Sequence, residues 1–301
     1  MTGLCEYGDE VARALANKAP LVALETTLVT HGLPHPDGVT TAVSLEQVVR
    51  EAGATPATIG IIGGAIRIGL TPAELEHLAT APDVAKVNLS NLAAAVSSGQ
   101  PGSTTVAATM FAAHAGGIRV FATGGIGGVH RDASESGDIS ADLTALSRIP
   151  VAVVSAGAKA ILDLPRTVEM LETLGVPVFG FMTDEFPAFY RRSTGLPVDR
   201  RYDSITELAS AVRLHLSLGL GTGVLIANPI PVADEMASQL YDRALHTALS
   251  EAEALHIRGR AVTPFLLERM HAWTGGESVR ANVALLRHNA RVAAALAVAG
   301  A

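Results

Sequence analysis

The chain has 301 residues, of which 49% are apolar, 4% aromatic and 17% charged, and its formal net charge is -7. This acidic balance, with no long run of one sign, argues against a nucleic-acid partner or an anionic membrane surface. No apolar run reaches the ~20 residues that a membrane helix needs, and the acidic start does not resemble a signal peptide. The single cysteine, Cys5, allows no internal disulfide. We therefore expect a protein of the cytoplasm.

Strands and helices alternate along the predicted chain. Apolar runs predict strands at residues 21–24, 57–62, 66–70, 120–122, 151–154, 176–181 and 223–227. Periodicity and helix-start signals predict helices at residues 9–17, 39–52, 71–80, 106–115, 165–174, 204–218 and 234–255, another from residue 263, and a last one to about residue 298. This alternation is typical of a mostly parallel sheet covered by helices on both faces. We predict a single α/β/α domain over residues 1–301.

Polar residues follow several of these strands and begin one helix. Glu25 ends the strand at residues 21–24, where a carboxylate suits a site better than a core, although it could instead cap the following turn. Lys86 stands in an apolar segment, a pattern more common for a surface lysine. Thr104 and Thr105 precede an alanine-rich helix whose free amides could receive an anion.

Residues 119–163 carry the densest set of candidate groups. A strand at residues 120–122 ends in a cluster of glycines, and a polar loop leads to a second strand at residues 151–154, which Lys159 follows. In open parallel sheets, ligands bind beyond the carboxyl ends of the strands. We therefore expect the active site here.

The polar loop closes on Asp138, Ser140 and Asp142. Their spacing of two would point all three to one side of an extended segment. The same residues also suit the start of a helix. Carboxylates with water favour Mg²⁺ or Mn²⁺ over Zn²⁺, and the Cys/His spacings of zinc sites are missing. We interpret His31 and His130 as polar loop residues.

Lys159 follows a glycine in an otherwise apolar stretch. A lysine that loses its solvent becomes a nucleophile toward carbonyl-type carbon. The alternative is a lysine at a helix start that reaches into solvent, and the apolar neighbours Ala156, Ala158 and Ile161 favour the reactive interpretation. The aromatic residues within 183–190 either form the wall of a pocket for a flat ring or make a small satellite core.

Taken together, these segments resemble the pseudouridine-5'-phosphate glycosidase family over almost the whole chain. The resemblance rests on stretches such as ALETTLVTHGLPHP, VFATGGIGGVHR, DISADL, SAGAKAILDL and TGGESVRANVALL. It implies an α/β/α fold, a homotrimer and one divalent metal per subunit, usually Mn²⁺, with Mg²⁺ or other ions possible. It also implies reversible cleavage of the C–C glycosidic bond of pseudouridine 5'-phosphate to uracil and ribose 5-phosphate, through a lysine Schiff base.

The resemblance also assigns roles to particular residues. Glu25 matches the proton donor, Lys159 matches the Schiff-base nucleophile, and Asp138 matches the metal ligand. Asp142 is a second candidate for moving protons. The residues that we expect to bind substrate are Lys86, Thr105, Val106, Ser140, Ala141, Asp142 and Asn282. The tract at residues 87–91 has no basic residue, where relatives often carry arginines.

Two other functions remain open from the residues alone. A Schiff-base lyase or aldolase that acts on another sugar phosphate would use the same lysine without a pocket for a base. A non-catalytic nucleotide-binding protein would need only the glycine loop.

Overall fold

Eleven strands form one sheet in the computed structural model, which describes residues 5–257 and 262–300. The strands are β1 (Cys5–Tyr7), β2 (Leu21–Leu24), β3 (Thr55–Ile62), β4 (Ala65–Ile68), β5 (Ala85–Val87), β6 (Gly102–Thr104), β7 (Val120–Ala122), β8 (Ala152–Ser155), β9 (Val178–Phe181), β10 (Arg200–Tyr202) and β11 (Val224–Ala227). Their order is β1-β4-β3-β2-β7-β8-β11-β9-β10, and β6 joins β5 to β3. All neighbours from β3 to β10 in this order are parallel, which confirms the predicted mostly parallel sheet.

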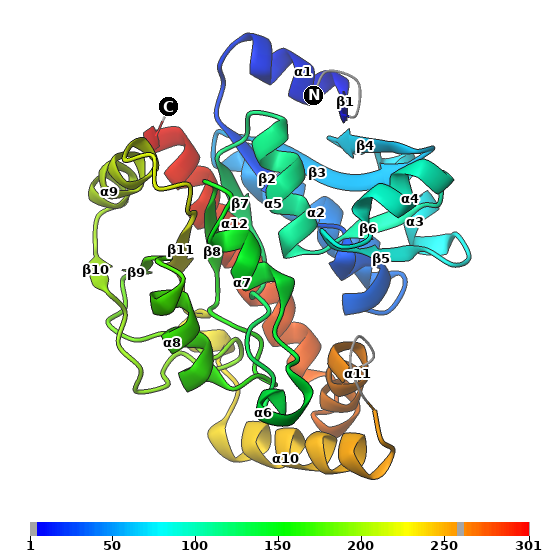
Figure 1. The fold of residues 1–301 in the computed structure, drawn as a ribbon, viewed down its shortest axis with the longest axis vertical. Helices are drawn as coiled ribbons and strands as arrows, with labels where there is room; N and C mark the ends of the chain where they lie inside the picture. Colours follow the sequence, from blue (N-terminus) through cyan, green and yellow to red (C-terminus); the bar gives the residue numbers. More distant parts are fainter. Residues whose placement is uncertain (1–4, 258–261, 301) are drawn as a thin grey trace.

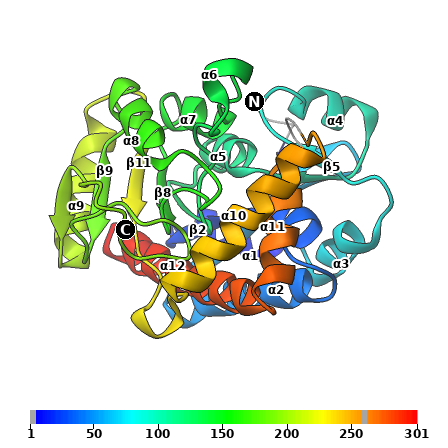
Figure 2. The same ribbon diagram turned by 90° about the horizontal axis from the view of Figure 1, so that it is seen from below.

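Helices cover both faces of this sheet (Figures 1 and 2). They are α1 (Asp9–Ala16), the π-helix η1 (Leu28–Gly32), α2 (Asp37–Glu51), α3 (Pro72–Thr80), α4 (Leu92–Ser98), α5 (Val106–Ala115), α6 (Ala133–Ser136), α7 (Ala141–Leu146), α8 (Leu164–Thr173), α9 (Ile205–Ser217), the 3-10 turn η2 (Val232–Asp234), α10 (Ser238–Ala254), α11 (Val262–Trp273) and α12 (Glu277–Gly300). On one face, α12 packs against β2, β7 and β8, and α5 packs against β2 and β7 from the other. Among the described residues, no helix is both long and apolar enough to cross a membrane.

Alanine brings both central helices close to the strands. Ala107, Ala108, Ala112 and Ala113 of α5 are buried, and α12 buries Ala290, Ala293, Ala294 and several leucines. Small side chains let a helix axis approach a sheet closely, so the packing fixes where each helix begins. The first turn of α5 therefore lies at a defined place beside the strand ends.

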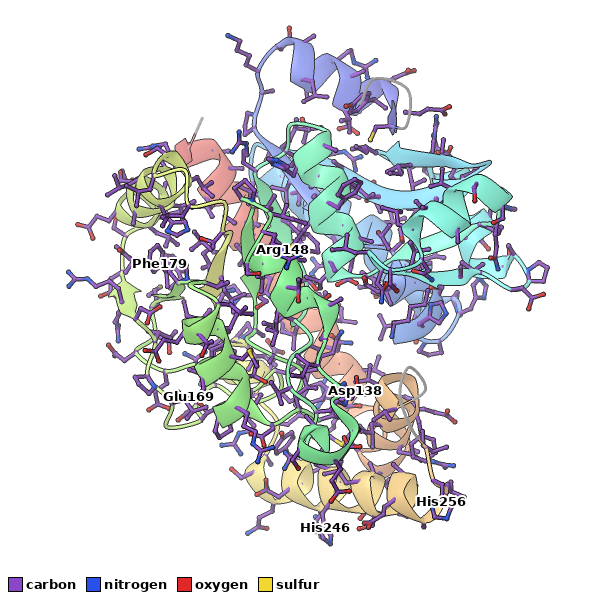
Figure 3. All side chains as sticks on the ribbon, viewed as in Figure 1. Asp138, Arg148, Glu169, Phe179, His246 and His256 are labelled. Atoms are coloured by element: carbon purple, nitrogen blue, oxygen red, sulfur yellow. The ribbon has the colours of Figure 1, made fainter. Side chains whose placement is uncertain are left out.

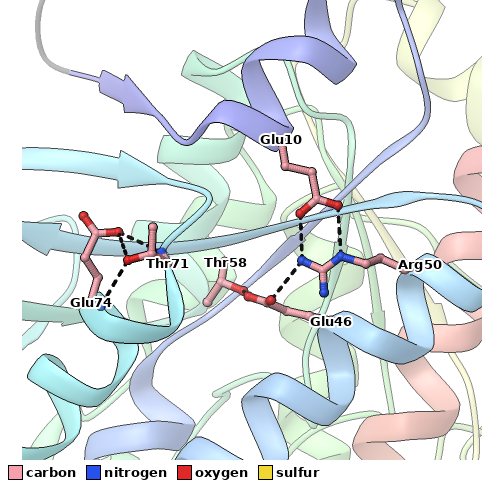
Figure 4. A network of polar contacts seen from close by, with 6 residues as sticks. All are labelled: Glu10, Glu46, Arg50, Thr58, Thr71 and Glu74. Carbon is pink, nitrogen blue, oxygen red and sulfur yellow. Dashed lines mark hydrogen bonds and ion pairs between the residues drawn. The ribbon is translucent and has the colours of Figure 1, made fainter.

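A polar network ties α1, α2 and β3 together (Figure 4). The buried carboxylate of Glu46 accepts a hydrogen bond of 2.6 Å from the Thr58 hydroxyl and one of 3.2 Å from Arg50. Arg50 also binds Glu10 of α1, which holds the pKa of the Glu10 carboxyl below its usual value. The same figure shows the predicted capping box at the start of α3, formed by Thr71 and Glu74.

The structure corrects two predictions. The helix predicted at residues 234–255 begins at Ser238, because the carboxylate of Glu235 accepts hydrogen bonds from Arg191 and the Arg192 amide. His31, predicted as a loop residue, lies within η1.

Candidate active site

Two cavities open at the carboxyl edge of the parallel strands, and they share Glu25, Thr27, Lys86 and Lys159 in their walls. The larger cavity has a volume of about 310 Å³ and the smaller one about 60 Å³. The remaining walls of the larger cavity come from Asn88, Ser90, Thr105, Val106, Gly127, His130, Asp138, Ile139, Ser140, Ala141, Asp142 and Leu162. Those of the smaller come from Leu28, His31, Gly32, Thr123, Gly124, Gly125, Phe189, Leu267, Asn282 and Leu286. The cavities thus contain every site residue predicted from the sequence, and their chemical roles stay predictions.

Glu25 owes its place to the pairing of β2 with β7. Leu24 is the register partner of Ala122, so the next residues, Glu25 and Thr123, leave the sheet side by side. The Thr123 hydroxyl donates a hydrogen bond to Glu25 Oε1. Burial raises the pKa of the Glu25 carboxyl, and it outweighs the opposing effect of the Lys159 charge. A carboxyl held in this way keeps its proton to higher pH and suits a proton donor.

Lys159 is held by main-chain bonds between its own segment and the glycine loop. Its amide donates to the Ile126 carbonyl at 3.0 Å, and the Ile126 amide donates to the Gly157 carbonyl at 3.0 Å. Gly157 has a φ of +75°, a conformation that favours glycine, and a Cβ there would lie 2.9 Å from the Pro187 carbonyl carbon. Lys159 itself is only partly buried and contributes to the walls of both cavities.

Asp142 lies in the first turn of α7, and Ser140 caps that helix by accepting from the Asp142 amide. The helix-start alternative is therefore the correct one for these residues. Asp142 Oδ1 accepts from the Ala107 amide of α5 at 3.0 Å, and Oδ2 accepts from the Gly127 amide at 2.8 Å. Because both oxygens bind main-chain donors, Asp142 is better placed to hold α5, α7 and the glycine loop together than to move protons.

The first turn of α5 and strand β5 supply groups that suit an anion. Thr105 precedes the first residue of α5, and its buried hydroxyl has no hydrogen-bond partner among the described residues. Val106 follows it at the positive end of the helix dipole. Lys86 of β5 lines the same cavity, so it is not the surface residue that the sequence pattern favoured. Asn88 and Ser90, in the tract that lacks basic residues, also line this cavity.

Asp138 stands on the segment that joins α6 to α7 (Figure 3). The nearest ionisable partner is His130, whose Nε2 lies 4.0 Å from Asp138 Oδ2. No cluster of three His, Cys, Asp or Glu side chains able to hold a metal occurs in the described part of the chain. One carboxylate in a cavity that the Ser140 hydroxyl also lines would suit a hard cation that keeps most of its waters. It does not fit zinc, which needs three or four protein ligands.

Of the two alternatives left open for the aromatic residues within 183–190, the small satellite core is wrong, because Phe186, Phe189 and Tyr190 are all buried in the main core. Phe189 also forms a wall of the smaller cavity, as the other alternative expects. Asn282 of α12 supplies an amide to that cavity, among the apolar side chains of Leu267 and Leu286. A flat ring with polar edges would suit such a space.

His31 is a residue of this site that the sequence analysis took for a polar loop residue. Its Nδ1 lies 2.5 Å from the Thr30 hydroxyl and 3.2 Å from the Ser103 hydroxyl. Burial, helped by the Lys86 charge, lowers the pKa of His31, so its ring is neutral at neutral pH. The sequence does show that His31 follows soon after the strand that precedes Glu25, which could have suggested a place near the site. The π-helix η1, which brings His31 back to the cavity, has no hydrophobic periodicity that would predict it.

Comparison with known proteins places this site in a family. The family model described as indigoidine synthase A like protein matches residues 10–299. A protein of Methylobacterium nodulans named pseudouridine-5'-phosphate glycosidase is 54% identical over 296 residues, which cover 98% of this chain and 88% of that protein. A protein of the same name from Caldanaerobacter subterraneus subsp. tengcongensis is 51% identical over 298 residues, 99% of this chain and 97% of that protein.

Solved structures show the same fold. The prealnumycin C-glycosynthase in complex with ribulose 5-phosphate has a TM-score of 0.91 at 40% identity, over 100% of this chain and 98% of that one. An indigoidine synthase A-like protein from Thermotoga maritima has a TM-score of 0.89 at 35% identity, over 98% of this chain and 96% of that one.

Proposed function

Because the chain belongs to the pseudouridine-5'-phosphate glycosidases of the indigoidine synthase A-like family, we propose that it cleaves and re-forms the C–C glycosidic bond of pseudouridine 5'-phosphate. The reaction joins or separates uracil and ribose 5-phosphate. The observation that carries the proposal is the junction of the two cavities, where Glu25 and Lys159 lie in both walls.

Each cavity suits one half of this substrate. The larger one offers hydroxyls, a lysine and a helix start, which suit a sugar phosphate. The smaller one offers apolar walls and the Asn282 amide, which suit a uracil ring. The bond to be broken then lies between Glu25 and Lys159. The ribulose 5-phosphate bound by the prealnumycin C-glycosynthase supports a sugar phosphate as ligand for this fold.

Lys159 is the proposed nucleophile because direct cleavage would expel a carbanion of uracil. Opening of the ribose ring breaks the C1'–O4' bond, so that the ring oxygen takes up a proton and C1' becomes electrophilic. The amine of Lys159 adds to C1' and gives up a proton, and the C1'–C5 bond then breaks as the nitrogen lone pair forms an iminium. Water hydrolyses the iminium to ribose 5-phosphate and frees the lysine.

Glu25 is the proposed donor of the proton that C5 of uracil gains when this bond breaks. Its burial keeps the carboxyl protonated to higher pH, and its hydrogen bond to Thr123 fixes its direction. In synthesis the same carboxylate takes the C5 proton away. Asp142 supports both directions indirectly, because it holds the α5 start and the glycine loop in place.

The phosphate group is proposed to lie against Lys86, the Thr105 hydroxyl and the Val106 amide. Ser140 and Ala141 complete that side of the cavity. Binding energy from a group this far from the reacting carbon contributes to catalysis when it holds C1' against the lysine.

Asp138 is the proposed ligand of a divalent metal, Mn²⁺ or Mg²⁺, with water and phosphate oxygens as the other ligands. The ion would supply positive charge to the phosphate. We extend the proposal to a homotrimeric assembly, which the family resemblance implies, and to a cytoplasmic location, which the single cysteine and the acidic start of the sequence favour. Light scattering after size-exclusion chromatography tests the assembly.

The direct test is to incubate the purified protein and Mn²⁺ with pseudouridine 5'-phosphate and to measure free uracil by chromatography. We expect uracil and ribose 5-phosphate in equal amounts. A protein that releases no uracil but cleaves another sugar phosphate would be a lyase of the alternative class. A protein that binds the nucleotide without any product would be a binding protein.

A further inference from the structure

Phe189 occupies an unfavourable backbone conformation at the wall of the smaller cavity. Its φ is +61°, in the left-handed region that bulky side chains rarely adopt. A residue keeps such a conformation only when its surroundings hold it there, and such residues cluster at ligand sites. The position of Phe189 therefore calls for a functional explanation.

Two contacts hold Phe189 in this conformation. Its amide donates a hydrogen bond of 2.9 Å to the carbonyl of Ala156, in the segment that leads from β8 to Lys159. Its ring meets that of Tyr190 edge to face, with the ring centres 4.8 Å apart and the planes at 85°. The amide of Ala156 in turn donates to the Gly124 carbonyl at 2.9 Å. The Phe189 ring is thus fixed relative to the lysine segment and the glycine loop.

The glycine loop leaves space for this ring. A Cβ at Gly125 would lie 2.6 Å from Phe189 Cδ2 and 2.9 Å from Cε2. A Cβ at Gly124 would lie 3.2 Å from Phe189 Cε2 and 3.3 Å from Leu286 Cδ2. The loop therefore has glycine at the two positions where a side chain would collide with the Phe189 ring. The packing of this ring explains why glycine occupies both positions.

The smaller cavity leaves little room beside its walls. Its volume is about 60 Å³, against about 310 Å³ for the larger cavity that it joins. Phe189 and Leu286 supply apolar walls, and Asn282 supplies a polar edge. The Phe189 amide is hydrogen-bonded to Ala156, and its ring packs on Gly124 and Gly125. These contacts oppose a movement of the ring that would admit a larger base.

We propose that Phe189 is the residue that determines specificity for the base, by limiting the smaller cavity to one unsubstituted pyrimidine ring. This inference rests on the proposed function, since it names the selectivity of the same site. It makes Phe189 a wall that the base contacts, and it gives the aromatic segment a role beyond packing.

The test runs the reaction in the direction of synthesis. Ribose 5-phosphate and a uracil form the C1'–C5 bond, while C5 loses its proton and the C1' oxygen leaves as water. The acceptors are uracil, 1-methyluracil, 3-methyluracil and 6-methyluracil, which all keep C5 free. One methyl group against an apolar wall changes kcat/KM by about 10- to 200-fold. We expect the wild type to reject at least one methyluracil to this extent, and Phe189→Ala to reduce that rejection about tenfold or more.

Matched variants separate selectivity from folding. Phe179→Ala makes the same change on β9, at a ring that lines neither cavity (Figure 3), and should leave the ratio of methyluracil to uracil unchanged. Phe189→Gly should melt at a higher temperature than Phe189→Ala, because glycine accepts the positive φ. If Phe189→Ala does not fold, the ratio of kcat/KM for methyluracil to kcat/KM for uracil is measured on Phe189→Leu instead.

The outcomes distinguish the two proposals. A wild type that makes no product from uracil and ribose 5-phosphate contradicts the proposed function. A wild type that makes product but accepts all three methyluracils like uracil contradicts the role of Phe189. So does a Phe189 variant whose ratio of methyluracil to uracil equals that of the wild type.

Discussion

Glu25 shows how one residue's surroundings set its chemistry. Burial raises the pKa of its carboxyl, whereas Lys159, Thr123 and Lys86 act against that rise. The protonated donor is therefore lost only as pH rises through this raised value. We expect kcat/KM for uracil release to fall on that limb. Glu25→Gln should lose about 10²- to 10⁴-fold below the raised pKa and should lack this limb. A pH–rate profile checks both, and a Glu25→Gln enzyme with the wild-type profile would contradict the assignment.

The same raised pKa has a consequence for stability. A carboxyl whose folded pKa exceeds its unfolded value binds its proton more tightly in the native state, so it lowers stability as pH rises from the unfolded toward the folded pKa. Glutamine carries no charge and does not have this loss. Thermal unfolding should therefore show Glu25→Gln gaining on the wild type between about pH 5 and about pH 8. An equal difference in melting temperature at both values would argue against the burial effect.

Much of the site was predictable residue by residue, and the exceptions have a common cause. Glu25 and Lys159 each follow an apolar run, so their place at the sheet edge could be predicted from the strands alone. Thr123 also ends a strand, but its role depends on β2 lying beside β7, which the sequence does not state. His31 lies at the site because η1 turns the chain back, and Phe189 lies there because its backbone adopts a positive φ. Neither feature has a sequence pattern that predicts it.

At the scale of elements, Asp142 joins three parts of the site. Its carboxylate accepts main-chain hydrogen bonds from α5 and from the glycine loop. Asp142→Ala should leave two buried amides unpaired and cost about 2–4 kcal/mol of unfolding free energy. Denaturant unfolding measures this, with Asp138→Ala as the control, because Asp138 is partly exposed and should cost less. Equal losses of unfolding free energy in the two variants would contradict the proposal that Asp142 holds α5, α7 and the glycine loop together.

The network between α1, α2 and β3 offers a second test at this scale (Figure 4). Thr58→Val removes the hydroxyl that donates to the buried Glu46 carboxylate. The loss should be about 1–3 kcal/mol, because a buried acceptor loses a partner. The exposed Thr40 lies on α2, and Thr40→Val should stay within about 0.5 kcal/mol of the wild type. A Thr58→Val protein as stable as the control would contradict the network's contribution.

Elements made of an apolar run were predictable from the sequence, and short strands without one were not. The predicted bounds of β2, α5 and β7 agree with the structure, because each is an apolar run with a clear end. The strands β1, β6 and β10 have three residues each and carry no periodicity. Their pairing with distant strands makes them strands, so only the folded chain reveals them.

For the whole molecule, the parallel sheet and its two helical layers followed from the alternation of elements, but the order of strands did not. That order brings Glu25, just after β2, and Lys159, after β8, to opposite sides of β7, in the walls of the same pair of cavities. The glycine loop follows β7, the strand between them. The chemistry of the site is thus a property of the topology as much as of any residue.

Metal dependence tests the whole assembled site, because the proposed ion needs both the cavity and the phosphate. We expect a chelator to abolish uracil release and Mn²⁺ or Mg²⁺ to restore it better than Zn²⁺. Asp138→Ala should remain folded by circular dichroism yet need far more Mn²⁺ for half-maximal activity. Full release of uracil in excess chelator would contradict the proposed need for a divalent metal.

The proposed reaction requires a covalent bond between Lys159 and the sugar. To detect it, the protein is incubated with ribose 5-phosphate and borohydride and digested, and the adduct is located by mass spectrometry. We expect one reduced ribose 5-phosphate on Lys159, and none on a folded Lys159→Arg variant, because guanidinium stays protonated and cannot add to carbon. An adduct on Lys86 instead, or a Lys159→Arg enzyme that still releases uracil at the wild-type rate, would contradict it.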